Sequence, residues 1–239
     1  MPQIEQTVVR NHLLAALPPE DFRRLVPLLT PVPLKLKQIL YAADEPIEAC
    51  YFVESGMVSL LAPLEGGGSM EIGVIGREGL VGLPVLLGAE SAPSEALVQG
   101  AGTAFHIQAS ALKRVFDDSV PLRTLLLRYT QAVQIQISQT AVCNGSHTVE
   151  ERLARWMLMT HDRAEGDQFP MTHEFMSLML GVRRAGVTTA AGVLKRIGAI
   201  DYGQGTMTVL DRPVLESAAC ECYGIVRQQF ERLLGTQRR

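Results

Sequence analysis

The fold is decided by the stretch HEFMSLMLGVRRAGVTTAAGVL, residues 173–194. Its apolar residues recur at three- and four-residue steps on both sides of Gly181, which predicts two short helices separated by this glycine. Ser177, four residues before the glycine, is small enough for the second helix to approach closely. Val187, six residues after the glycine, is placed to fill the crossing. Two helices joined by a short turn that contains glycine predict a helix-turn-helix.

The second helix begins with two cations, Arg183 and Arg184. In DNA-binding proteins of this type, that end of the helix contacts base edges in the major groove, and arginine can bind guanine through two hydrogen bonds. Gly186 interrupts the helix, and the only physical reason we find is close approach of its backbone to DNA or to the first helix. The predicted DNA-binding residues are Thr172, His173, Arg183, Arg184, Thr188, Thr189 and Lys195.

The segment IGAIDYGQGTMTVLD, residues 197–211, follows this helix. It predicts a strand, a turn at residues 203–205 and a second strand with alternating polarity, which together form a β-hairpin. A hairpin at this point is the wing of a winged helix. The order of helix, helix-turn-helix and wing favours DNA binding over an ordinary solvated basic surface.

Charge is unevenly distributed over the 239 residues, whose formal net charge is −3. Residues 1–145 hold 10 basic and 14 acidic side chains, whereas residues 146–239 hold 12 and 11. Within residues 173–200, four cations stand against a single acid. The total alone argues weakly against nucleic-acid binding. Its distribution, however, places a basic cluster on the predicted helix-turn-helix.

Composition excludes several classes of protein. With 47% apolar residues the chain can bury substantial cores, so a largely disordered protein is excluded. No apolar run approaches the roughly 20 residues of a membrane span, and the N-terminal sequence lacks the pattern of a secretory signal. We therefore expect a cytoplasmic protein with no membrane partner. The motifs HExxH, GxSxG, GxGxxG and a Walker loop are missing, so we expect no enzyme.

Residues 32–108 contain short stretches rich in β-branched and aromatic residues, separated by glycine, proline and acidic residues. Several short strands at close spacing predict an antiparallel barrel, sandwich or roll. The periodicity changes at Ser119, a predicted helix cap that is followed by Pro121 in the first turn. The chain is therefore predicted to be an α+β protein in which a β-rich half precedes a helical half.

The predicted helix 119–143 is long and apolar on more than one side, so it needs two packing partners. One is its own domain, and the other is either a second copy of this helix or simply more of the same core; the spacing does not decide between them. Asn144-Gly145-Ser146 predicts the end of the helix and a hinge, and Thr148 with Glu151 predicts a capping box that begins the next helix. The candidate dimer-interface residues are Leu122, Leu125, Leu126, Tyr129, Val133 and Ile137.

The whole chain resembles the CRP/FNR family of bacterial transcription regulators. The resemblance covers residues 11–212 and depends on YFVESGMVSLL (51–61), GVIGREGLVG (73–82), Glu151-Arg152-Leu153-Ala154 and the 172–194 segment. It implies a cyclic-nucleotide-binding-type β-roll at 11–118, a dimerisation helix and hinge at 119–145, and a winged-helix DNA-binding domain with a helical extension at 146–239. It further implies a homodimer on a palindromic double-stranded operator, RNA polymerase as a partner, and an effector that the sequence does not identify.

The sensor half departs from the cyclic-AMP-responsive members. These have a glutamate after the glycine that matches Gly82, where this chain has Leu83, and an Arg-Ser pair where this chain has Ser94-Glu95, followed by Ala96. Without the arginine and with an added anion, cAMP or cGMP binding is disfavoured at these five candidate effector residues. Two alternatives stay open: a cyclic-nucleotide-responsive regulator with an atypical phosphate site, and a sensor that acts on a protein partner.

The four cysteines do not match the oxygen-sensing members, whose iron–sulfur cluster needs four converging thiolates. Cys50 alone lies in the β-rich half, and Cys143 lies near the hinge. Cys220 and Cys222 are two residues apart on a predicted helix, so their side chains should point about 200° apart and not chelate together. We therefore predict no iron–sulfur cluster, no metal site and no certain cofactor.

The second helix of the helix-turn-helix also departs from the family pattern. It has Ala185 and Thr189 where the family often has Glu and Arg, which predicts a different DNA half-site.

Overall fold

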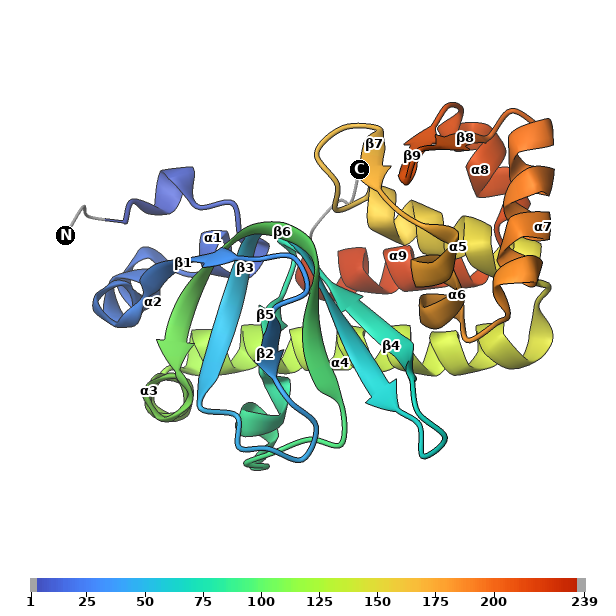
Figure 1. Ribbon diagram of the computed structural model, residues 1–239. Coiled ribbons are helices and arrows are strands. Elements are labelled where there is room, and N and C mark those ends of the chain that lie inside the picture. The colour runs from blue at the N-terminus through green and yellow to red at the C-terminus, as the bar shows by residue number, and fades with distance from the viewer. Residues whose placement is uncertain (1–3, 236–239) are drawn as a thin grey trace.

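The computed structural model describes residues 4–235. The N-terminal segment packs against one end of a β-sheet (Figure 1). Asn11 caps the first α-helix by accepting a hydrogen bond from Leu14 N, and its side-chain amide donates to the carbonyl oxygens of Val53 and Gly79. This one buried side chain therefore fixes the segment to the sheet. Its elements are η1 (Gln6–Val8), α1 (His12–Ala15), α2 (Pro19–Leu25) and η2 (Val26–Leu28).

A six-stranded antiparallel sheet forms the β-roll, with the order β1-β6-β3-β4, β2 paired to β6 and β5 paired to β3. β3 and β6 are long and pair side by side, with a bend marked by register shifts between Val53 and Val58. At this bend Gly56 has φ +82°, and a Cβ on Gly102 would lie 2.1 Å from Ser55 O, so both positions require glycine. The elements are β1 (Thr30–Leu34), β2 (Ile39–Tyr41), β3 (Ala49–Pro63), β4 (Ser69–Ile75), β5 (Leu80–Val81), η3 (Leu83–Leu87) and β6 (Glu95–Gln108).

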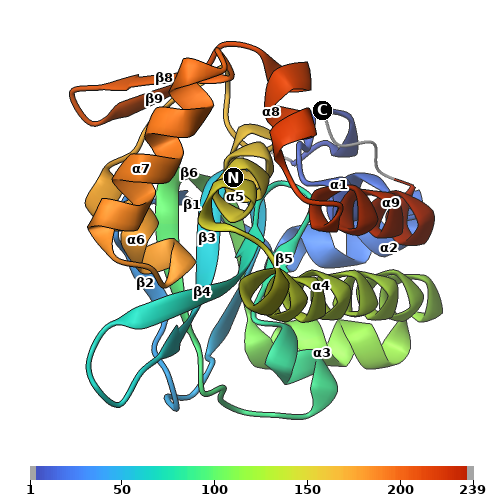
Figure 2. The ribbon, with the colours of Figure 1, turned by 90° about the vertical axis from the view of Figure 1, so that its right-hand side faces the viewer.

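Two helices follow the roll, α3 (Ala109–Asp118) and the long α4 (Val120–Ser146), which runs alongside the sheet (Figures 1 and 2). Ser119 caps α4 by accepting a hydrogen bond from Leu122 N, as predicted. Tyr129 lies so close to the roll that a Cβ on Gly79 would meet its hydroxyl at 2.1 Å. The predicted end of the helix at residues 144–146 is wrong: these residues are still helical, and His147 is the C-terminal cap.

The C-terminal domain, residues 149–234, combines helices with a three-stranded sheet ordered β7-β9-β8. Its first helix begins with the predicted capping box, in which Thr148 and Glu151 exchange hydrogen bonds. The elements are α5 (Val149–His161), β7 (Gln168–Pro170), α6 (His173–Leu180), α7 (Arg184–Arg196), β8 (Ile200–Gly203), β9 (Thr206–Val209), α8 (Arg212–Ala218) and α9 (Cys222–Leu234). No helix within residues 4–235 combines the length and apolar character needed to cross a bilayer.

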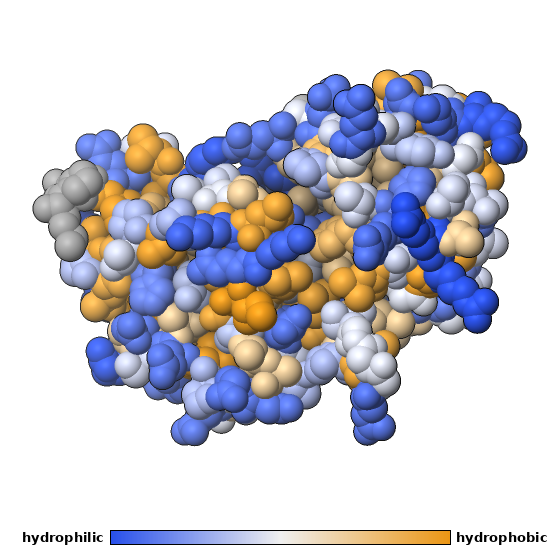
Figure 3. Space-filling model, viewed as in Figure 1, coloured by the Kyte–Doolittle hydropathy of each residue, from blue (hydrophilic) through white to orange (hydrophobic). Residues whose placement is uncertain are grey.

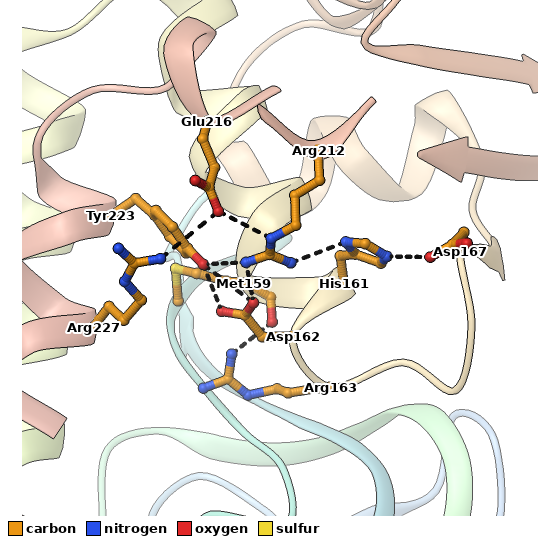
Figure 4. A network of polar contacts seen from close by, with 9 residues as sticks. All are labelled: Met159, His161, Asp162, Arg163, Asp167, Arg212, Glu216, Tyr223 and Arg227. Atoms are coloured by element: carbon orange, nitrogen blue, oxygen red, sulfur yellow. Dashed lines mark hydrogen bonds and ion pairs between the residues drawn. The ribbon is translucent and has the colours of Figure 1, made fainter. Parts of the chain in front are cut away.

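A polar network attaches α8 and α9 to the end of α5 (Figure 4). Arg212 donates to Asp162 Oδ1 at 2.6 Å and to His161 Nδ1 at 3.0 Å, and it also pairs with Glu216. Burial raises the pKa of Tyr223 to about 12, so its phenol keeps its proton and donates to Asp162 at 3.1 Å. The last two helices are thereby held in one orientation against α5.

The roll and the C-terminal domain share a continuous core. Met57, Leu61 and Val74 of the roll belong to the same buried cluster as the core of the C-terminal domain. Two carboxylates of the roll reach across this boundary: Glu78 pairs with Arg163 at 2.5 Å, and Glu71 accepts a hydrogen bond from Trp156 Nε1 at 2.8 Å. The two domains are therefore joined by both apolar and polar contacts.

Glu71 is fully buried without a directly bonded cation. Its Oε2 lies 2.7 Å from Ser59 Oγ, which also lies 2.6 Å from Gln99 Oε1. Because a hydroxyl has one proton, Ser59 donates to Glu71 and accepts from Gln99 when the Gln99 amide presents its otherwise unpaired Nε2 to Ser59 Oγ. Burial raises the pKa of Glu71 from 4.5 to about 7, despite hydrogen bonds from Ser59 and Trp156 that lower it. Burial therefore outweighs these hydrogen bonds, and the carboxyl keeps its proton to a higher pH than an exposed glutamate does.

The raised pKa of Glu71 makes stability depend on pH. Because the folded-state pKa lies above that of the unfolded chain, the stabilisation is complete below pH 4.5 and is lost as pH rises to about 7. Relative to Glu71→Gln, the wild type should lose about 3 kcal/mol of unfolding free energy over this window. Urea unfolding at a series of pH values measures this, with the exposed Glu65→Gln as control. Parallel pH profiles for wild type and Glu71→Gln would contradict it.

Candidate nucleic-acid interface

The helix-turn-helix has the predicted geometry. Thr172 caps α6 by accepting a hydrogen bond from Phe175 N at 3.1 Å, and α6 ends at Gly181, whose φ of +62° is left-handed. Arg183 is the N-terminal cap residue of α7. Val187 is completely buried between the two helices and the domain core, as its spacing from Gly181 predicts. The left-handed turn at Gly181 therefore sets the angle between α6 and α7.

One face of α7 is open to solvent and carries most of the predicted DNA-binding side chains. Arg183, Arg184, Thr188, Thr189 and Lys195 are all exposed. The threonine hydroxyls donate to backbone carbonyls one turn earlier, Thr188 to Arg184 O and Thr189 to Ala185 O. The hydroxyl protons are thus used within the helix, and the exposed threonine methyl groups are suited to contact with thymine methyls.

His173 links the first helix to the second. Its Nδ1 lies 3.0 Å from Thr188 Oγ1, and its ring stacks at a tilt on Tyr202 of the wing, with centroids 4.8 Å apart. Burial, and then the nearby Arg184, hold the pKa of His173 below its ordinary value. The imidazole is therefore neutral at pH 7 and acts here as a hydrogen-bonding spacer rather than as a cation.

The predicted wing is present and touches the end of α7. β8 and β9 pair through a tight turn at Gln204 and Gly205, both with positive φ. Lys195 forms an ion pair with Asp201 of the wing at 2.5 Å and lies over the ring of Tyr202. Part of the positive charge at this end of α7 is thus balanced within the chain. Arg183 and Arg184 at the N-terminal end, and Arg196 at the C-terminal end, are exposed cations that form no ion pair with the described residues.

Two glycines within α7 are not explained by packing inside the chain. A Cβ built on Gly186 or on Gly192 would meet nothing within 4 Å. Close approach of the first helix, one of the two reasons considered for Gly186, is therefore excluded. A glycine here costs helix stability of about 0.5–1 kcal/mol relative to alanine. The remaining reason is an external surface that approaches α7 closely.

The predicted effector residues fall only in part around one cavity. A cavity of about 160 Å³ lies between the roll and α4, and Gly82, Leu83 and Ser94 line it. Glu95 and Ala96 lie on β6 and do not line it. Sequence reasoning missed the other lining residues, which come from the roll and from α4, a helix that was assigned to dimerisation alone. Four of them lie on α4. They are Thr130, Val133, Gln134 and Ile137.

A second, more open hollow lies between the roll and α6, lined by residues such as Leu36, Leu97, Phe175 and Leu178. Figure 3 shows hydrophobic residues gathered over the middle of this face, between the sheet and the C-terminal domain. The hollow borders the first helix of the helix-turn-helix and leaves the exposed face of α7 free. It therefore adjoins the candidate DNA interface only at Thr172, which lines it.

The predicted dimer interface requires correction. Leu122, Leu126, Tyr129 and Val133 are buried within the chain's own core, where Val226 and Phe230 of α9 pack with them. Leu125 and Ile137 are half-buried against the same core. These six residues therefore form the inward face of α4. The C-terminal helix α9, which the sequence did not connect with α4, is the partner that satisfies the apolar stripe.

The orientation predicted for Cys220 and Cys222 is also wrong. α9 begins at Cys222, so Cys220 lies in the non-helical link after α8 and the helical angle between the two positions does not apply. Their thiols converge with the side chains of Cys143 and His147, all four ligand atoms lying within 4.8 Å of one another.

Comparison with known proteins agrees with this architecture. The family model described as a cyclic nucleotide-binding domain matches residues 31–119, and that described as a Crp-like helix-turn-helix domain matches residues 151–218. Together they span about two thirds of the chain. No curated protein sequence matches at a significant level.

Several solved structures are similar in fold. FixK2 from Bradyrhizobium japonicum has a TM-score of 0.70 at 20% identity, covering 80% of this chain and 98% of that one. A regulator of the crp/fnr family from Eubacterium rectale has 0.67 at 16%, covering 86% and 96%. The c-di-GMP-responsive regulator CLP from Xanthomonas campestris has 0.62 at 15%, covering 80% and 99%.

The fold and the exposed α7 define a winged-helix DNA-binding protein that carries a cyclic-nucleotide-binding-type β-roll. With both family models matched in this order, the chain belongs to the CRP/FNR family of transcription regulators.

Proposed function

We propose that this protein is a homodimer that regulates transcription by binding a palindromic operator, with α7 of each copy in successive major grooves about 34 Å apart. The observation that carries the proposal is the exposed N-terminal end of α7, where Arg183 and Arg184 stand beside Thr188 and no acid of the chain is paired with them in the described residues. RNA polymerase is the partner that the family resemblance implies for such a regulator.

A different face of α4 supports dimerisation. Exposed residues recur along it at alternating steps of three and four, the period of a coiled coil. Leu127, near the start of this row, leaves 46% of its surface exposed. The small residues further along would let two helices approach closely. We propose that this row is the seam between two copies: Thr124, Leu127, Gln131, Gln134, Ser138 and Ala141.

We further propose that the cavity beside α4 takes a small, uncharged, largely apolar effector. Most of its lining is aliphatic and none of its lining side chains is charged. A cyclic nucleotide carries a phosphate charge that such a lining does not compensate. An engineered cavity of about 150 Å³ with a comparable lining binds benzene, which indicates the size of ligand that fits.

The position of α4 explains how such an effector would act. The helix presents the proposed seam on one face, contributes four residues to the cavity on another, and ends at the joint with the C-terminal domain. Gln134 lies both on the cavity wall and in the exposed row. A ligand that binds one pose of α4 better than another would therefore shift the pair of recognition helices between poses.

Replacing Arg184 by alanine should weaken operator binding by 10- to 100-fold and relax preference at one base position, corresponding to about 1–3 kcal/mol. Duplexes selected from a random pool, followed by gel shift at several salt concentrations, measure this. Arg114→Ala, an exposed arginine on α3, is the matched control and should leave affinity unchanged. Wild-type protein that shows no sequence-selective retardation would overturn the DNA-binding proposal and favour action on a protein partner.

Leu127→Asp should convert the dimer to a monomer, because it places a charge in the proposed seam. Light scattering measures the mass. Leu64→Asp places the same charge on an equally exposed leucine of the β3–β4 turn and should stay dimeric. Aspartate at the fully buried Leu126 would test folding instead. A Leu127→Asp protein that remains a dimer would exclude this seam.

Benzene should raise the melting temperature of the protein, because a ligand that binds only the folded state stabilises it. Val133→Phe, which fills the cavity, should remove that increase while leaving the circular dichroism spectrum unchanged. Calorimetry with cAMP should show no saturable binding below the millimolar range. Micromolar cAMP affinity would contradict an uncharged effector and support a cyclic-nucleotide-responsive regulator with an atypical phosphate site.

A further inference from the structure

Three cysteine thiols and one histidine imidazole meet where α4 ends and α9 begins. Cys143 lies in the last turn of α4, and His147 is its C-terminal cap. Cys220 lies in the link between α8 and α9, and Cys222 is the first residue of α9. The Sγ atoms of Cys143 and Cys220 are 3.5 Å apart, and Cys222 Sγ is 3.6 Å from His147 Nδ1. Segments more than 70 residues apart in sequence thus contribute to one cluster.

The spacing of these atoms is that of ligands around a single ion. Thiolates bind zinc at about 2.3 Å, so in a tetrahedron neighbouring sulfur atoms lie about 3.8 Å apart. The shortest contacts here are close to this value, and all four ligand atoms lie within 4.8 Å of one another. An ion at the centre would need only small side-chain movements. By contrast, 3.5 Å is well beyond a disulfide bond, and the three thiols are free.

Burial and neighbouring groups are those of a structural metal site. The three cysteines are buried and form a small cluster of their own, and the His147 side chain is 13% exposed. Glu221 lies 3.3 Å from His147 Nε2, on the opposite side of the ring from Cys222. A carboxylate in this position fixes the ring and makes the coordinating nitrogen more basic. Gln139 Nε2, 3.1 Å from Cys222 Sγ, provides a second supporting contact.

We propose that Cys143, His147, Cys220 and Cys222 bind one zinc-type divalent metal ion. Three sulfur ligands and one imidazole nitrogen select a borderline-soft ion that accepts tetrahedral geometry. Four protein ligands leave no open position, so the ion is structural and takes no part in catalysis. It would tie the end of α4 and the joint after it to the turn before α9. The proposal does not depend on which DNA sequence or effector the protein binds.

Metal content of the full-length protein tests the site directly. After purification with zinc present and removal of loose metal by gel filtration, elemental analysis should find about one zinc per chain. Cys222→Ser and His147→Gln should each lower this at least several-fold. Cys50→Ser, the matched control, should leave it unchanged because Cys50 lies in the roll against Gly82.

Cobalt gives a second measurement that does not depend on the stability of the variants. Wild-type protein stripped of metal and reloaded with Co²⁺ should show the intense visible bands of tetrahedral cobalt and thiolate-to-cobalt charge transfer. Absence of both zinc and these bands in a folded wild-type protein would overturn the proposal. So would iron with labile sulfide, or a Cys143–Cys220 disulfide found by mass spectrometry in freshly purified protein.

Discussion

The buried ion pair between Arg163 and Glu78 is the contact on which the arrangement of the two domains depends. Arg163 donates to Glu78 Oε1 from both Nε and Nη2, and to the carbonyl oxygens of Met159 and Val74. Removing one partner of such a pair typically costs about 3–5 kcal/mol, because the other charge stays buried. That is a large part of the roughly 5–15 kcal/mol by which domains are stable. The pair therefore strongly favours one relative orientation of the two domains over similar orientations.

The same boundary holds a second contact of different character. On the roll, Glu71 and Glu78 are seven residues apart, and their partners Trp156 and Arg163 are also seven apart. One contact is a charged pair and the other centres on a carboxyl that prefers its proton. Two acids of the roll thus supply the polar contacts that help to fix the relative position of the roll and the C-terminal domain. Any signal that passes from the cavity to α7 must preserve or exchange these contacts, together with the apolar packing of Met57, Leu61 and Val74 against the C-terminal domain.

Sequence reasoning succeeded where a local constraint fixes the structure. The helix-turn-helix follows from Ser177, Gly181 and Val187, because only such a spacing permits close crossing, and the caps at Ser119 and Thr148 follow from orphan backbone donors. It failed where the structure depends on contacts with residues far away in the sequence. The stripe of Leu126 and its neighbours has the same period whether α9 or a second molecule covers it. The prediction placed Cys220 and Cys222 on one helix, whereas α9 begins at Cys222, and this difference sufficed to turn Cys220 away from Cys222 in the prediction.

The packing of α9 has a consequence for how the molecule is made. Val226 and Phe230 belong to the same core as Leu13 and Leu126, so α9 completes the core of the β-roll half and not only that of the winged helix. A ribosome releases the roll and α4 well before it releases these residues, and domains generally fold in the order of synthesis. Here the N-terminal core keeps one apolar face of α4 uncovered until α9 has been synthesised. A nascent chain, or a variant truncated before α9, would therefore expose the apolar face of α4 and be prone to aggregation.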